Sequence, residues 1–277
     1  LSPTQRIAVI GPLAEARRDL LGMWVLNGRA EDADTVVEAL RGYLPDPTTL
    51  THVAGCPIQG EGEFALEAAV AAAQAADVVI AVVGEGHELS GEARSRAHLG
   101  LPGRQQELVD ALAQTGKPLV VVLMCGRPLV IPRLVEQAGA LLVGWHGGIR
   151  AGQAVADILF GAVNPSGKLT TTWPQAQGQI PVYYAHKNTG RPMDSAGTTQ
   201  FLEPFRSGYL DEPNAPLFPF GAGLSYTTFA YRELTVETPV LNQDSTLIVS
   251  AQVQNTGERG GTEVVQLYVR DLVGSVT

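Results

Sequence analysis

The chain has 277 residues, of which 45% are hydrophobic and 17% are charged, a balance typical of a globular protein with a substantial buried core. Its net charge of −9 argues against a nucleic-acid partner, because proteins that bind phosphate backbones concentrate lysine and arginine on one face. No uninterrupted apolar run reaches the roughly 18 residues of a membrane span, and the first residues lack a basic segment followed by an apolar one, so we expect no membrane segment and no targeting signal in this sequence.

From Arg6 to about Trp173, short β-branched runs alternate with amphipathic or alanine-rich stretches. This alternation predicts a doubly wound α/β domain, in which helices cover both faces of a parallel sheet. The β-branched runs, expected to be strands, are Ile7–Ile10, Thr51–Val53, Val78–Val83, Leu119–Met124 and Leu141–Trp145. The intervening stretches, expected to be helices, are Val36–Leu44, Phe64–Ala75, Gln105–Gln114 and Ala151–Phe160.

The rhythm is lost between residues 164 and 226, where prolines, glycines and aromatic residues dominate. So much irregular chain is usually functional or lies at an interface. We therefore predict an α/β sandwich domain over residues 1–226 that ends in a long irregular segment.

From Tyr231 onward, apolar residues recur with a period of two. This period predicts three antiparallel strands, within 233–240, 245–257 and 261–272, with a turn at Asn255-Thr256-Gly257. A sandwich of the immunoglobulin type has about seven strands. We therefore expect residues 227–277 to form only the start of a β-sandwich, so that the chain is cut off within a domain.

No residue pattern predicts a metal or nucleotide site. The histidines and the two cysteines, Cys56 and Cys125, have no metal-ligand spacing, and both thiols are expected to be inert. Gly84-Glu85-Gly86 resembles part of a phosphate-binding loop, but no helix starts directly after it and no lysine follows at the required spacing.

The segment from Asp77 to Gly103 carries the most informative contrast in the chain. An uncharged run bounded by Asp77 and Gly84 reads as a strand buried on both faces. In open parallel sheets, ligands bind beyond the carboxyl ends of the strands. The carboxylates Glu85, Glu88 and Glu92 follow this strand, so they are candidates for general acid or base chemistry.

Glu92 is the best of these candidates, because Gly91 and Ala93 leave room for a substrate beside it. Arg94 and Arg96 follow at alternate positions, where they could orient a carboxylate or hold the loop. The alternative is an ordinary solvated loop. Trp145 is an aromatic candidate. It ends a strand on the same edge of the sheet and could either stack on a sugar or fill the core.

These residues together resemble the glycoside hydrolase family 3 β-glucosidases, of the bacterial periplasmic branch, in the part that follows the catalytic barrel. The most specific matches are IAVIGPLA, DLLGMW, VVIAVVGE, SGEARSRAHLGLPGRQQELV, TGKPLVVVLMCGRPL, AVADILFGAVNPSGKLTTTWP, GQIPVYYAHKNTGRP and LFPFGAGLSYTTF. The resemblance covers nearly the whole chain. It implies an α/β sandwich domain followed by the first strands of a fibronectin-type-III-like β-sandwich.

The resemblance also implies a retaining mechanism that needs no cofactor and no metal. An aspartate on an N-terminal (β/α)8 barrel, absent from this chain, attacks the anomeric carbon, and a glutamate on the second domain protonates the leaving oxygen. Glu92 matches that glutamate. The loop has the form Glu-Ala-Ser-Ser-Arg in the periplasmic branch, and this sequence departs from it only at Arg94. Should Glu92 not be the acid, Glu85 and Glu88 are the next candidates.

Several alternatives stay open under this resemblance. The substrate is a β-glucoside or short oligosaccharide, but β-xylosidase or another specificity of the family is also compatible, and a non-catalytic carbohydrate-binding or assembly domain is a third possibility. The segment Asn188–Tyr209 could wrap the barrel, line the cleft, form a homodimer contact or be a surface loop. The resemblance favours a periplasmic or secreted protein.

Overall fold

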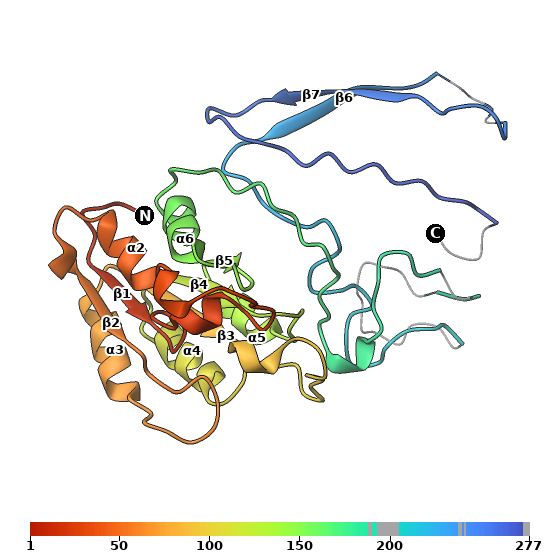
Figure 1. The fold of residues 1–277 in the computed structure, drawn as a ribbon. Coiled ribbons are helices and arrows are strands. Elements are labelled where there is room, and N and C mark those ends of the chain that lie inside the picture. The colour runs from red at the N-terminus through yellow and green to blue at the C-terminus, as the bar shows by residue number, and fades with distance from the viewer. Residues whose placement is uncertain (188–189, 193–204, 238–239, 241, 274–277) are drawn as a thin grey trace.

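The structure is a computed structural model that describes residues 1–187, 190–192, 205–237, 240 and 242–273. A five-stranded parallel sheet forms its centre, with the strand order β2-β1-β3-β4-β5 (Figure 1). The strands are β1 (Ile7–Ile10), β2 (Leu50–Val53), β3 (Val78–Gly84), β4 (Leu119–Met124) and β5 (Ala140–Val143). The predicted α/β fold with a parallel sheet is therefore confirmed.

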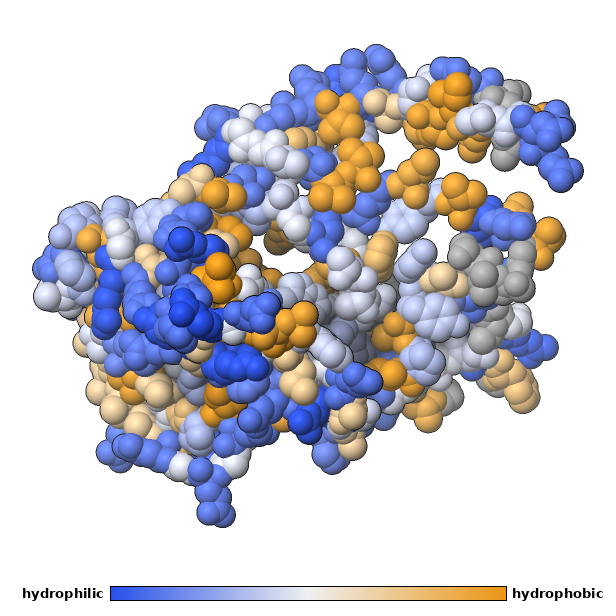
Figure 2. Space-filling model, in the orientation of Figure 1, coloured by the Kyte–Doolittle hydropathy of each residue, from blue (hydrophilic) through white to orange (hydrophobic). Residues whose placement is uncertain are grey.

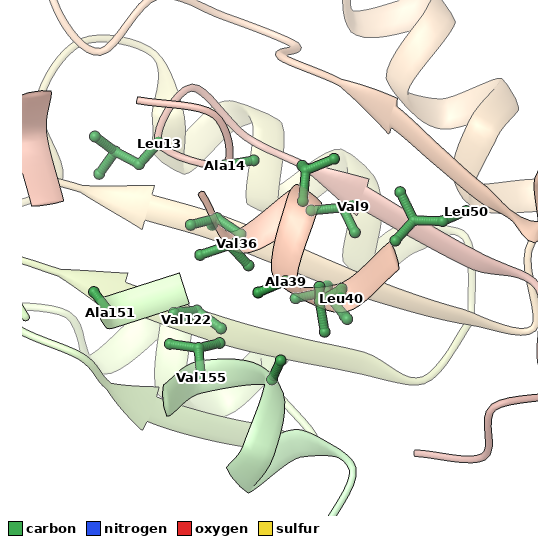
Figure 3. Close-up of a cluster of buried hydrophobic side chains, with 14 of the residues drawn as sticks. Val9, Leu13, Ala14, Val36, Ala39, Leu40, Leu50, Val122, Ala151 and Val155 are labelled. Atoms are coloured by element: carbon green, nitrogen blue, oxygen red, sulfur yellow. The ribbon is translucent and has the colours of Figure 1, made fainter. Parts of the chain in front are cut away.

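Helices cover both faces of this sheet. α2 (Val36–Gly42) and α6 (Ala151–Leu159) pack together over one face, and α3 (Leu66–Ala75), α4 (Gln105–Gln114) and α5 (Pro132–Gln137) lie over the other. Figure 3 shows the cluster of buried side chains under α2 and α6.

The central strand β3 contributes to the cores on both faces. Its residues Val78, Ile80 and Val82 belong to the cluster under α2 and α6. The intervening residues Val79, Ala81 and Val83 belong to the cluster under α3 and α4. Every residue of β3 is buried, as the uninterrupted apolar run predicts.

The shortest helices were not predicted. These are α1 (Arg17–Leu20) and α5, together with the 3-10 turns η1 (Ala30–Asp32), η2 (Pro47–Thr49), η3 (His87–Leu89) and η4 (Gln177–Gln179). They are too short for an apolar period of 3.6 residues to appear in the sequence. Within the described ranges, no helix combines the length and apolar character needed to cross a bilayer.

The described residues between 164 and 226 form no long helix or strand, as predicted, and stretches from the two sides of this segment pair with each other. The Trp173 amide donates to the Phe218 carbonyl at 2.8 Å, and the Leu217 amide donates to the Trp173 carbonyl at 2.8 Å. Trp173 is fully buried in the cluster under α3 and α4. Most of the segment Asn188–Tyr209, for which several roles were predicted, lies outside the described residues.

The C-terminal part contains an antiparallel pair, β6 (Phe229–Val236) and β7 (Val249–Asn255). The prediction of a third strand within 261–272 is wrong, because this stretch forms no ladder with its neighbours in the structure. Its alternating pattern is typical of a strand, but a strand also needs a hydrogen-bonded partner, and β6 and β7 pair only with each other. Leu234, Val236 and Val269 of this C-terminal part are exposed. Figure 2 shows hydrophobic residues on the surface of this part of the molecule.

Candidate active site

The candidate site lies at the carboxyl edge of the parallel sheet. The strand order places the topological switch between β1 and β3, where ligands bind in doubly wound folds. Glu85 follows β3 directly, Arg127 lies just beyond the end of β4, and Trp145 and His146 lie just beyond the end of β5. Residues from three strands therefore meet at one edge.

Glu85 is a fully buried carboxylate clamped by two guanidinium groups. Its Oε1 lies 2.8 Å from Nη1 of Arg96 and 3.1 Å from Nε of Arg127. Its Oε2 accepts the backbone N–H of Gly126 at 3.2 Å. A buried carboxylate is stable only when it is paired and hydrogen-bonded in this way. Glu85 thus cannot reach a substrate, which removes it as an alternative acid.

Both arginines also hold the loop that carries Glu92. Arg127 donates through Nη2 to the carbonyl oxygens of Leu89 and, at 2.7 Å, Arg94. Arg96 donates through Nη2 to the carbonyl oxygen of Gly100 at 3.0 Å. The prediction that Arg96 could hold the loop is consistent with these contacts.

Glu92 itself is exposed and lies between the two fixed ends of the loop. Gly91 before it has φ +110, and Ala93 after it has φ +59. A Cβ atom at Gly91 would lie 2.6 Å from Cγ of Met23, so the chain passes too close to this side chain for a larger residue. The small neighbours therefore shape the backbone around Glu92.

A hollow of about 350 Å³ opens beside this loop. Its lining residues are Gln59, Glu88, Leu89, Ala93, Arg94, Ser95 and Arg96. Glu88, Arg94 and Arg96 are thus brought together around one cavity, whereas Glu92 stands on the exposed loop at its border. Charged and polar side chains make up most of the lining of this hollow.

Trp145 does not line this hollow. Its indole ring is half-buried and packs against Trp173, with ring centroids 5.8 Å apart and an interplanar angle of 57°. The structure therefore favours the core-filling interpretation over sugar stacking.

Residues 1–226 match the family described as "Glycosyl hydrolase family 3 C-terminal domain". The chain belongs to glycoside hydrolase family 3. It is 40% identical over 297 residues to a periplasmic beta-glucosidase of Salmonella typhimurium, and 40% identical over 280 residues to a beta-xylosidase of Formosa agariphila. These matches cover 100% of this chain but only 38% and 37% of the two relatives.

Solved structures give the same result. The beta-glucosidase of Listeria innocua in complex with glucose aligns with a TM-score of 0.90 and 39% identity, covering 100% of this chain and 37% of that one. A GH3 beta-glucosidase of Bifidobacterium adolescentis aligns with a TM-score of 0.71 and 27% identity over 93% of this chain and 37% of that chain. The chain therefore spans little more than a third of the length of these relatives.

A second polar network, which the sequence analysis missed, supports the loop from the side of α1 and β5. Asp19 accepts the backbone N–H of His87 at 2.7 Å, and the same Oδ1 atom lies 2.7 Å from Nδ1 of that ring. The backbone carbonyl oxygen of Asp19 accepts a hydrogen bond from Nδ1 of His146 at 2.8 Å. Nε2 of His146 lies 3.3 Å from the Ser90 hydroxyl.

Gln105 is another residue that sequence reasoning missed. It is fully buried, accepts the Gly84 N–H at 2.7 Å, and donates to the carbonyl oxygens of Gly84 and Ile58, both at 2.8 Å. It thereby satisfies the backbone where β3 ends and the site begins. A glutamine at the first turn of a predicted helix was the only available signal.

We expect the pKa of the His146 imidazole to lie below its ordinary value of 6.5, because burial disfavours the charged form. The unfolded chain then binds this proton at a higher pH than the folded chain does. The free energy of unfolding is accordingly highest above about pH 6.5 and declines as the pH falls through the folded pKa. Urea unfolding at a series of pH values should show a shallower decline for His146→Asn, and an unchanged slope would contradict the assignment.

Cys56 and Cys125 should resist alkylation in the folded protein. Both thiols are buried, and burial raises the pKa of Cys56 to about 11 and the pKa of Cys125 to about 12. Because the thiolate is the nucleophile, neither should react with iodoacetamide at neutral pH until the protein unfolds. Peptide mass mapping with and without denaturant measures this, and rapid native labelling of either residue would oppose it.

Proposed function

We propose that this chain is the C-terminal part of a retaining, exo-acting β-glucosidase and that Glu92 is its general acid/base. The observation that supports the proposal best is the loop itself. Glu92 is an exposed carboxylate at the border of a polar hollow, while buried ion pairs to Glu85 fix the two ends of its loop to the sheet.

The reaction proceeds in two steps. In the first, an aspartate of a preceding (β/α)8 barrel domain attacks the anomeric carbon while Glu92 protonates the departing glycosidic oxygen. In the second, Glu92 as carboxylate takes a proton from water, which displaces the aspartate and releases the sugar with its configuration retained. Such a pair of carboxyl groups lies about 5–5.5 Å apart.

The residues around Glu92 have different roles in this proposal. Arg96 holds the loop, and Glu88 and Arg94 line the hollow, where they contact the substrate or its leaving group. Trp145 supports the edge of the site from the core. No cofactor or metal is required.

The domain organisation also forms part of the proposal. Residues 1–226 form the α/β sandwich domain, and residues 227–277 begin a fibronectin-type-III-like domain. The exposed apolar side chains of β6 and β7 support the latter, because a two-stranded ribbon must be covered by further strands to be stable. We also propose a periplasmic or secreted location, which the Salmonella relative suggests. The proposed oligomeric state is a homodimer.

A β-xylosidase is the second candidate, since the Formosa agariphila relative is as similar to this chain as the Salmonella one. Comparing p-nitrophenyl β-D-glucoside with the β-D-xyloside on the full-length enzyme separates the two. The substrate with the larger kcat/KM defines the specificity.

The decisive test is azide rescue of Glu92→Ala in the full-length enzyme. The variant should hydrolyse p-nitrophenyl β-D-glucoside slowly, and azide should restore turnover by forming β-glucosyl azide, identified by NMR. Azide needs no general base to attack the glycosyl-enzyme, so it replaces the missing function. Wild-type rates without azide would instead support a non-catalytic carbohydrate-binding or assembly domain.

A further inference from the structure

We infer that Arg127 is a positioning residue for the proton transfer by Glu92, an inference that rests on the function proposed above. Arg127 belongs to the segment after β4, which is remote in sequence from the loop. It nevertheless bonds that loop on both sides of Glu92, at the carbonyl oxygens of Leu89 and Arg94. One planar guanidinium thus spans the segment that carries the acid.

The anchor of this guanidinium is buried. Nε of Arg127 lies 3.1 Å from Oε1 of Glu85, whose side chain is 0% exposed, while the Arg127 side chain is 21% exposed. An ion pair with a fully desolvated carboxylate is much less screened by solvent than a surface pair. Glu85 in turn is the residue that directly follows the central strand. A rigid strand end therefore fixes Arg127, and Arg127 fixes the loop.

Apolar burial contributes little to holding the part of the loop around Glu92. Residues 91–95 are all exposed, so little buried area holds this part of the loop in place. Arg96 helps from within the loop, through Glu85 and the Gly100 carbonyl, but its bonds lie only on the C-terminal side of Glu92. Arg127 bonds the loop on the N-terminal side, at Leu89, as well as just after Glu92, at Arg94.

The consequence for the reaction is specific. A general acid must lie within about 2.6–3.2 Å of the oxygen that it protonates. A displacement of about 1 Å can cost on the order of 100-fold in rate. Loosening the clamp should therefore slow the departure of a leaving group that needs a proton, and should hardly affect one that leaves as a stable anion.

The test compares two substrates on the full-length enzyme. We expect Arg127→Lys to lower kcat/KM for phenyl β-D-glucoside by about 10- to 100-fold more than kcat/KM for 2,4-dinitrophenyl β-D-glucoside. Lysine keeps the charge but lacks the planar fork that reaches two carbonyls and Glu85 together. The ratio of the two rates on one preparation does not depend on how much enzyme is correctly folded.

Arg133→Lys is the matched control. Arg133 is an exposed arginine a few residues further along the chain and is paired with Asp110 at 2.8 Å, so this change should leave the ratio unaltered. Glu85→Gln is a second variant. It weakens the anchors of both Arg127 and Arg96 but leaves the bonds from Arg127 to the two loop carbonyls in place, so it should shift the ratio in the same direction as Arg127→Lys.

An equal loss on both substrates, or no loss, would overturn the inference, because it would give Arg127 a purely structural role or none. Measuring Glu92→Gln in the same assay separates the two proposals. If Glu92→Gln leaves the ratio unchanged, the proposed acid is wrong. If Glu92→Gln shifts the ratio and Arg127→Lys does not, only the positioning role is lost.

Discussion

Replacing Glu92 with glutamine in the full-length enzyme should lower kcat/KM for phenyl β-D-glucoside by about 10²- to 10⁴-fold, the usual contribution of a general acid. Glutamine has nearly the shape of glutamate but has no carboxyl proton to give to the phenolate oxygen. The 2,4-dinitrophenyl glucoside should lose far less, since its leaving group departs without a proton. In addition, the alkaline limb of the pH–rate profile, which reports loss of the acid's proton, should disappear.

Glu88→Gln is the control for this experiment. Glu88 is an exposed glutamate that lies in the same region and lines the neighbouring hollow. Its replacement should leave the shape of the pH–rate profile unchanged, even if binding of the substrate weakens. If Glu88→Gln rather than Glu92→Gln abolished the alkaline limb, the acid would have to be reassigned to Glu88.

Replacing Gly84 with alanine should prevent the sheet edge from forming, at a cost of more than about 3 kcal/mol in the free energy of unfolding. Gly84 has φ +135, and a Cβ atom there would lie 1.7 Å from the backbone oxygen of Met124 on the neighbouring strand. That oxygen cannot move without breaking the ladder between β3 and β4. The expected result is little or no soluble enzyme, or a sharply lower Tm by calorimetry.

Gly116→Ala provides the matched comparison. Gly116 also has a positive φ, +70, but a Cβ atom there would have no heavy atom within 4 Å. Alanine should cost only the backbone strain of about 1–2 kcal/mol. A similar loss of stability in both variants would show that strain alone, and not the approach of the two strands, makes glycine necessary at position 84.

The secondary structure of the α/β domain could be predicted because its signals are local. The run Val78–Val83 is apolar throughout, as expected of a strand that helices cover on both faces. The helix Gln105–Gln114 and the strand Leu119–Met124 were predicted with the bounds that the structure shows. Helices shorter than two turns, such as α5, have too few residues for an apolar period to be recognised.

The order of the strands and the third C-terminal strand were beyond such signals. The alternating pattern over residues 261–272 indicates which side chains could share one face of a strand. Whether that strand forms depends on hydrogen bonds to another strand, which distant residues must supply. In the structure, β6 and β7 pair only with each other. The same reasoning explains why the sequence could indicate a parallel sheet but not that β1 lies between β2 and β3.

The sequence by itself determined that the chain contains an α/β domain with a parallel sheet and that a charged loop lies beyond the central strand, and it indicated Glu92 as the candidate acid in that loop. Only the tertiary structure decided that Glu85 is buried rather than available for chemistry, and that Arg127 and His146, from other strands, hold the loop. The physical reason is distance along the chain. Periodicity and turn chemistry arise between near neighbours, whereas a buried charge is stable only where the fold brings its partners to it.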